Sequence, residues 1–121
     1  MTQPDQPAVF AELLRIWQSG PGEAILAIVT ADYRGHMLHL GADRDRAAYP
    51  DRIDSHRAQF PAARFEVVDQ SETGDRLFSR IEANRTSDGV ELVSHGMNVS
   101  RFVDGLIAEE WAIWTEWRET P

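Results

Sequence analysis

The sequence predicts an α+β domain in which helices come first and a sheet of consecutive strands follows. Up to about residue 60, apolar residues recur every three or four positions, the spacing of amphipathic helices. From residue 63 onward they form short runs separated by polar turns, and Asp104-Gly105 is a strong signal for a two-residue hairpin. Helices followed by consecutive antiparallel strands are typical of α+β folds. The 121 residues fit one domain, expected over residues 8–118 after a flexible N-terminus of residues 1–7.

Three helices are predicted. The first covers residues 8–18, where Phe10, Leu13, Leu14 and Trp17 share a face, and it ends at the Ser19-Gly20-Pro21-Gly22 stretch. The second covers about residues 23–31 and leads into a short strand or loop around Met37.

The third helix starts near Tyr49, with Pro50 in its first turn, and ends before Pro61. Tyr49, Ile53, His56 and Phe60 lie on one face of it. The Asp and Arg residues around this helix are expected to form a solvated surface of mixed sign.

The strands are expected at residues 63–70, 77–83, 92–103 and 106–117. With Asp104 and Gly105 as the loop, counting pairs Phe102 with Ile107, Ser100 with Glu109 and Asn98 with Trp111. Because side chains alternate along a strand, this register places one set on the face toward the cavity: Asn98, Ser100, Phe102, Ile107, Glu109, Trp111, Ile113 and Thr115. The other face then carries Val99, Arg101, Val103, Leu106, Ala108, Glu110, Ala112 and Trp114, with Arg101 paired to Glu110.

The composition excludes several function classes. A net charge of −8 without a basic cluster disfavours nucleic acid as a partner, and no apolar run approaches the roughly 20 residues that span a bilayer. The chain has no cysteine, and no signal peptide is evident at its start, so a cytoplasmic protein is expected. His36 and His39 lack a nearby carboxylate cluster, and no glycine-rich phosphate loop is present, so neither a metal nor a cofactor is expected.

Three stretches carry a family resemblance. Residues 31–36 (Ala-Asp-Tyr-Arg-Gly-His), Phe60-Pro61 leading to Val68, and above all residues 101–111 (Arg-Phe-Val-Asp-Gly-Leu-Ile-Ala-Glu-Glu-Trp) are similar to motifs of the nuclear transport factor 2-like superfamily. Within it, the chain resembles the SnoaL-like group of polyketide cyclases, over roughly residues 8–118. The resemblance implies a cystatin-like cone, in which three N-terminal helices pack on a curled antiparallel sheet that encloses a pocket.

The resemblance also implies dimerisation through the outer face of the sheet, for which Val99, Val103, Leu106, Ala112 and Trp114 are candidates. Members of the superfamily include cyclases, isomerases, epoxide hydrolases, dehydratases and proteins without catalysis, so the fold alone does not settle function. One departure matters. Where SnoaL-like cyclases usually carry a catalytic aspartate, four residues after the tryptophan that matches Trp111, this chain has Thr115.

Several residues are therefore candidates for the site. His36 is the predicted catalytic group, because imidazole transfers protons near neutral pH. Tyr33, Arg80 and Asn98 are candidates for stabilising negative charge on a substrate oxygen, although Glu82 could pair with Arg80 and Asn98 could simply pack in the core. The other expected contacts with a ligand are His56, Trp111, Ile113 and Thr115, although a hydrogen-bonded core histidine is the favoured interpretation of His56.

The leading hypothesis is an enzyme that cyclises, isomerises or dehydrates a hydrophobic, carbonyl-bearing, polyketide-like molecule by acid–base catalysis without a cofactor. The alternative is a non-catalytic protein of the same fold that binds a hydrophobic ligand or acts as a dimeric scaffold. A further alternative is an epoxide hydrolase of the limonene type, which needs an Asp-Arg-Asp group and for which only Arg80 is in hand.

Overall fold

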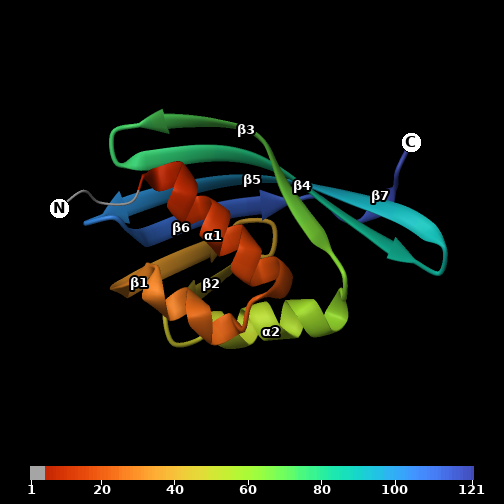
Figure 1. Ribbon diagram of the computed structural model, residues 1–121, viewed down its shortest axis with the longest axis horizontal. Coiled ribbons are helices and arrows are strands. Elements are labelled where there is room, and N and C mark those ends of the chain that lie inside the picture. The colour runs from red at the N-terminus through yellow and green to blue at the C-terminus, as the bar shows by residue number, and fades with distance from the viewer. Residues whose placement is uncertain (1–4) are drawn as a thin grey trace.

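The computed structural model describes residues 5–121 and contains an α+β fold (Figure 1). The helical elements are α1 (Gln6–Ser19), a 3₁₀ helix η1 (Gly22–Ala27) and α2 (Tyr49–Gln59). The strands are β1 (Val29–Met37), β2 (Ala42–Asp45), β3 (Arg64–Thr73), β4 (Arg76–Ser87), β5 (Val90–Val103), β6 (Leu106–Trp114) and β7 (Arg118–Glu119). The predicted fold class is confirmed.

The strands form one sheet in the order β2-β1-β6-β5-β4-β3, and β7 pairs with β5. The sheet is mixed rather than antiparallel throughout as predicted, because β1 runs parallel to β6. Figure 1 shows the sheet curling around α1, which lies across one face, with α2 below it. We call this covered side the inner face and the opposite side the outer face.

Two local predictions for the N-terminal half need correction. The second helix, expected over residues 23–31, is a single 3₁₀ segment that ends at Ala27, and Val29 already begins β1. The β-branched run Ile28-Val29-Thr30 favours a strand, and the Ile28 carbonyl accepts a hydrogen bond from Ile107 N–H (2.9 Å). The predicted flexible N-terminus falls mostly on residues 1–4, outside the described residues, but α1 begins at Gln6 because Asp5 caps it through Ala8 N–H.

The terminal hairpin has the predicted loop, but its register changes after one pair. Val103 pairs with Leu106 and Phe102 with Ile107, yet Arg101 then pairs with Glu109. Ala108 is therefore the extra residue of a β-bulge, which reverses the alternation of every later side chain in β6. The predicted faces of β6 are wrong from Ala108 onward.

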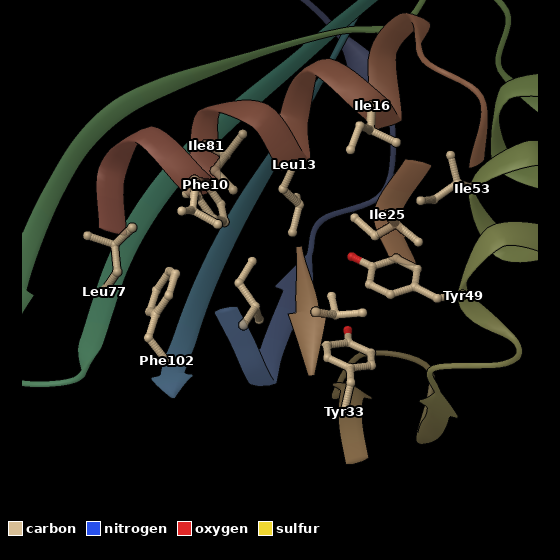
Figure 2. Packing of buried hydrophobic residues seen from close by; sticks show 13 residues of the cluster. Phe10, Leu13, Ile16, Ile25, Tyr33, Tyr49, Ile53, Leu77, Ile81 and Phe102 are labelled. Carbon is tan, nitrogen blue, oxygen red and sulfur yellow. The ribbon is translucent and has the colours of Figure 1, made fainter. Parts of the chain in front are cut away.

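The core lies between α1, α2 and the inner face of the sheet (Figure 2). Phe10 and Leu13 of α1 pack against Leu77, Ile81 and other inner-face side chains of β4 and β5. Figure 2 also shows Tyr33 and Tyr49 next to this cluster, with their rings stacked at a centroid distance of 5.0 Å. Within residues 5–121, no helix has the length and apolar character needed to cross a bilayer.

Candidate functional site

A cavity of about 370 Å³ lies between α1, α2 and the inner face of the sheet. Ligand pockets usually measure roughly 300–1,000 Å³ and are mostly apolar, and this cavity meets both criteria. Its aromatic lining consists of Phe10, Trp17, Tyr49, Phe60, Phe65, Trp114 and Trp117, with His56 among them. We call the end where the lining residues are solvent-exposed the mouth; it includes His39, Leu40, Arg52, Ser55, Gln59 and Thr115.

A buried polar cluster around Glu110 lies on the wall of this apolar cavity. Oε1 of Glu110 accepts hydrogen bonds from the hydroxyls of Tyr33 (2.6 Å) and Tyr49 (2.9 Å), and Oε2 accepts one from the Asn98 amide (3.1 Å). The Arg44 guanidinium lies 3.6 Å from Oε1 and donates through Nε to the Tyr33 hydroxyl. The cluster thus combines one carboxylate and one guanidinium, both almost fully buried, with three neutral donors.

The surroundings of this cluster hold each group in a defined state. Burial, followed by the negative charge of Glu110, raises the pKa of Tyr33, and burial likewise raises the pKa of Tyr49. Both phenols therefore stay protonated and donate. Burial alone would lower the pKa of Arg44, but the neighbouring Tyr49, Tyr33 and Glu110 outweigh it and raise the pKa, so the guanidinium remains charged.

Two backbone features place the cluster. The bulge at Ala108 turns Glu110 inward, opposite Ser100 and next to Gly35 of β1. A Cβ at Gly35 would lie 2.5 Å from the Tyr33 hydroxyl and 3.0 Å from Arg44 Nε. Glycine at this position therefore leaves the space in which the tyrosine and the arginine meet.

His56 lines the cavity from α2, on the same helix face as Tyr49. Its ring lies edge-on to Trp17 (centroids 5.3 Å apart) and close to the rings of Phe60 and Phe65. Burial and the positive charges of Arg52, Arg57 and Arg85 lower its pKa, which keeps the imidazole neutral at neutral pH. His56 therefore lies in the cavity lining, and its contact with a ligand stays a prediction.

The segment that follows β6, from Thr115 to Arg118, contributes the lining residues Thr115 and Trp117. Thr115 N–H donates to the His95 carbonyl, and the Thr115 hydroxyl accepts from His95 N–H, both at 2.9 Å. β7 then resumes pairing at Arg118 with Val93, so two residues, Glu116 and Trp117, lie opposite Ser94 alone. This second irregularity turns Trp117 toward the cavity, where it meets Phe60 at a centroid distance of 5.7 Å.

Comparison with known proteins agrees with this architecture. The SnoaL-like domain family matches residues 10–110, which is most of the chain. The chain belongs to the SnoaL-like family. No curated protein matches it.

Solved structures share the SnoaL-like fold. Wild-type IdmH from Streptomyces antibioticus, described as a candidate polyketide cyclase, is 26% identical with a TM-score of 0.78 over 91% of this chain and 92% of its own. A candidate polyketide cyclase from Acidithiobacillus ferrooxidans is 21% identical, with a TM-score of 0.78 over 96% and 92%. A protein from Catenulispora acidiphila with a ketosteroid isomerase-like fold, solved in complex with trimethylamine, is 13% identical, with a TM-score of 0.76 over 92% of this chain and 85% of its own.

The structure does not place His36 in the cavity of this SnoaL-like domain. His36 lies opposite Trp111 on the outer face, and the two rings stack at 5.6 Å. Its Nε2 lies 2.7 Å from Glu109 and its Nδ1 3.0 Å from Asp43, and these carboxylates raise its pKa. The prediction that His36 faces the ligand is wrong, because β1 directs Tyr33, Gly35 and Met37 inward and His36 outward.

Three other predicted ligand contacts also lie outside. Trp111 and Ile113 are on the outer face because of the bulge, whereas Trp114, predicted outside, lines the cavity. Arg80 is half-exposed on the outer face and pairs with Asp69 (2.8 Å), not with Glu82 as considered above. Arg80, the residue on which the epoxide-hydrolase alternative rested, therefore does not face the cavity.

The remaining predicted site residues, Asn98, Tyr33 and Thr115, lie at the cavity or in the polar cluster on its wall. Asn98 and Thr115 line the cavity, and Tyr33 contacts the cavity wall through Glu110. Glu110 and Arg44 are the functional candidates that sequence analysis missed. Arg44 looked like one of many surface charges, and Glu110 was assigned to the outer face in a pair with Arg101, which instead contacts Glu109 (3.2 Å). Within residues 5–121, no group of three or more acidic or histidine side chains could hold a metal ion.

Proposed function

We propose that this SnoaL-like protein is a cofactor-independent enzyme that transfers protons on a hydrophobic, carbonyl-bearing molecule of the polyketide type. Cyclisation, isomerisation and dehydration of such molecules can all begin with removal of a proton next to a carbonyl group. The observation that carries the proposal is the carboxylate of Glu110 on the wall of an otherwise apolar cavity, next to the buried guanidinium of Arg44.

Glu110 is the proposed base. Its Oε1 already accepts two hydrogen bonds, whereas Oε2 accepts one from the described residues, donated by Asn98. A carboxylate oxygen can accept about two, so Oε2 retains capacity for a substrate proton. The tyrosines and Asn98 fix the orientation of the carboxylate, and positioned general bases of this kind contribute roughly 10²–10⁴-fold to a rate.

Arg44 is the proposed stabiliser of the enolate oxygen. Its Nε donates to Tyr33 and its Nη1 lies 3.3 Å from the Met37 sulfur, a weak acceptor. Some N–H groups of the guanidinium therefore have no strong acceptor among the described residues. In a largely apolar cavity, a fixed positive charge stabilises a developing oxyanion strongly.

The family adds support. The chain shares its fold with proteins described as candidate polyketide cyclases, and IdmH is similar over nearly the whole length of both chains. Fold analogy by itself does not identify a reaction, so the substrate class rests on the cavity and on Glu110.

The test is proton exchange on a simple model ketone. 2-Tetralone is flat, bicyclic and enolisable, and loss of its α-proton signal in D₂O is followed by NMR. We expect the wild-type protein to accelerate exchange and Glu110→Gln to remove about 10²–10⁴-fold of that acceleration. Glu109→Gln is the matched control, because it removes the neighbouring charge from the outer face.

A paired variant separates chemistry from folding. The double variant Asn98→Asp/Glu110→Gln exchanges the carboxylate and the amide between two hydrogen-bonded positions. The negative charge near Arg44 is therefore retained. We expect folding to recover while exchange stays slow. If Glu110→Gln exchanges as fast as the wild type, Glu110 is not the base.

The second candidate function is non-catalytic ligand binding. Two observations favour it: Thr115 occupies the position of the family aspartate and uses its hydroxyl to hold a main-chain N–H, and Glu110 is already extensively hydrogen-bonded. A protein that binds 2-tetralone tightly but does not accelerate exchange would support this function over catalysis.

We also propose that the outer face of the sheet forms a homodimer. This face exposes Phe78, Met97 and Ile113 by 43%, 56% and 47%, and Trp111 lies among them. An exposed apolar patch of this kind on a sheet marks an interaction surface, and a two-fold interface would use the same patch on both copies. Sedimentation should give twice the 13.7 kDa chain mass, and Met97→Asp should give the monomer. A wild-type protein that sediments as a monomer at micromolar concentration excludes this assembly.

A further inference from the structure

Two arginine side chains at the cavity, Arg52 in its lining and Arg85 stacked on the lining residues Phe60 and Trp117, have no carboxylate partner among the described residues, in a protein whose net charge is −8. Arg52 lines the mouth from α2, on the helix face that also bears Tyr49 and His56. Arg85 comes from β4, in which every second residue faces inward, and it follows Ile81 and Ala83 on the inner face. Within residues 5–121, neither arginine is within 4 Å of a carboxylate, although Arg80 on the outer face of the same strand is.

Among the described residues, Arg85 is held by stacking and makes no side-chain hydrogen bond. Its guanidinium carbon lies 4.8 Å from the centre of the Phe60 ring and 4.9 Å from the centre of the Trp117 ring. Its Nε is buried without an acceptor among the described residues. Cation–π contacts fix the plane of the guanidinium and leave its N–H groups for another acceptor.

The nearby charges do not neutralise this region. Arg57, which donates to the main-chain carbonyl of Trp17 (3.3 Å), adds a third positive charge that acts on His56 in the cavity lining. Asp54 accepts from Gly22 N–H on the side of α2 that faces η1. Burial, and then the positive charges of Arg52, Arg57 and Arg85, lower the pKa of His56.

We propose that Arg52 and Arg85 form an anion-binding subsite at the mouth, so that the natural ligand is an amphiphile with a flat apolar body and an anionic group such as a carboxylate. The body would lie in the aromatic cavity between Trp17, Phe65 and Trp114, and the anionic group would reach the two guanidinium groups. Guanidinium is well suited to this role because its planar donors match a carboxylate. This inference rests on the proposed role of the cavity as a ligand site, and it specifies the chemistry of that ligand.

Two fluorescent probes of nearly the same shape test the subsite. 1-Anilinonaphthalene-8-sulfonate carries one negative charge, and N-phenyl-1-naphthylamine is its neutral parent. We expect Arg52→Gln and Arg85→Gln each to weaken binding of the anionic probe by about tenfold, in line with a charged hydrogen bond at a partly exposed site. Binding of the neutral probe should stay within about twofold, because the aromatic cavity is unchanged.

Arg80→Gln is the matched control, since it removes a charge from the same strand on the outer face and should change neither affinity. Arg85→Lys separates charge from stacking and should retain part of the affinity for the anionic probe. The subsite is excluded if the arginine variants bind both probes like the wild type, or if both probes weaken equally, which would assign Arg85 to holding Trp117 alone. If the neutral probe does not bind the wild type, the cavity is not a ligand site and this inference fails with it.

Discussion

Glu109 and Glu110 are neighbours in β6, yet they lie in very different environments. Glu110 is 1% exposed and contacts two tyrosines, Asn98 and Arg44 on the inner face. Glu109 is partly exposed on the outer face, where it contacts His36 and Arg101. The hydrogen bond from His36, and then Arg101, lowers the pKa of Glu109. One extra residue, Ala108, decides which of the two carboxylates meets the cavity.

The energy of such a network depends less on which groups it contains than on whether they are buried or exposed to water. Both carboxylates have a cation within reach, and both belong to networks that include aromatic rings. Charges at a protein surface are screened by water, whereas a buried charge without its partner is strongly unfavourable. The inner network is therefore expected to dominate stability and chemistry, and the outer one to contribute little.

The largest expected effect tests this difference directly. Glu110→Ala leaves Arg44 buried without a counter-charge and should lower the free energy of unfolding by about 3–5 kcal/mol. Glu109→Ala should lower it by about 0–1 kcal/mol, because water solvates His36 and Arg101. Urea unfolding measures both variants. Equal losses would show that burial does not separate the two sites.

A smaller effect is expected from crowding the inner cluster through its backbone. Gly35→Ala would bring a Cβ to 2.5 Å from the Tyr33 hydroxyl, so the tyrosine and Arg44 must shift. Overpacking of this kind costs about 1–3 kcal/mol. In the Glu110→Ala background, where the cluster is already disrupted, the same substitution should cost clearly less, because contacting residues are not additive. An unchanged cost would mean that Gly35 acts independently of the cluster.

A third variant concerns a polar group at the mouth that has a structural partner. Thr115→Ala removes the hydroxyl that accepts His95 N–H and should cost about 1 kcal/mol in unfolding free energy. Thr115→Ser keeps the acceptor and should cost less. Neither variant should slow proton exchange on 2-tetralone by more than a small factor if Glu110 is the base. A large loss of exchange with Thr115→Ala would return the active centre to the position of the family aspartate.

Much of the fold was predictable, because it depends on short-range patterns. The spacing of Phe10, Leu13 and Trp17 predicted α1, Pro50 and Pro61 marked the limits of α2, and Asp104-Gly105 located the hairpin. The second helix was predicted wrongly because its pairing partner, Ile107, is remote in sequence.

The site was less predictable, because it depends on single-residue irregularities. Unbroken alternation from the Asp104-Gly105 turn correctly placed Phe102 and Ile107, and it failed at Ala108. Nothing in the local sequence signals that bulge. The parallel pairing of β1 beside it, which brings Gly35 next to Glu110, is a tertiary feature. Arg44 was missed for the same reason, since only the folded chain buries it against Tyr49, with its guanidinium carbon 4.0 Å from the ring centre.

The smallest expected effect comes from His36 and appears as a dependence on pH. Hydrogen bonds to Glu109 and Asp43 raise its pKa in the folded protein above the unfolded value of about 6.5. Below about pH 6, His36 is protonated in both states and its ion pairs contribute fully to stability. As the pH rises through the raised folded pKa, the imidazole loses its proton and this contribution disappears. Because the site is partly exposed, the loss should stay below about 1 kcal/mol.

Urea unfolding at pH 6 and pH 9 should therefore show a larger decrease in unfolding free energy for the wild type than for His36→Gln. Glu109→Gln should reduce the same difference, since it removes the strongest partner. If His36→Gln has the same pH dependence as the wild type, the outer network does not couple protonation to folding. If its effect rivals that of Glu110→Ala, the outer face is less solvated than it is in the single chain, as burial in a dimer would make it.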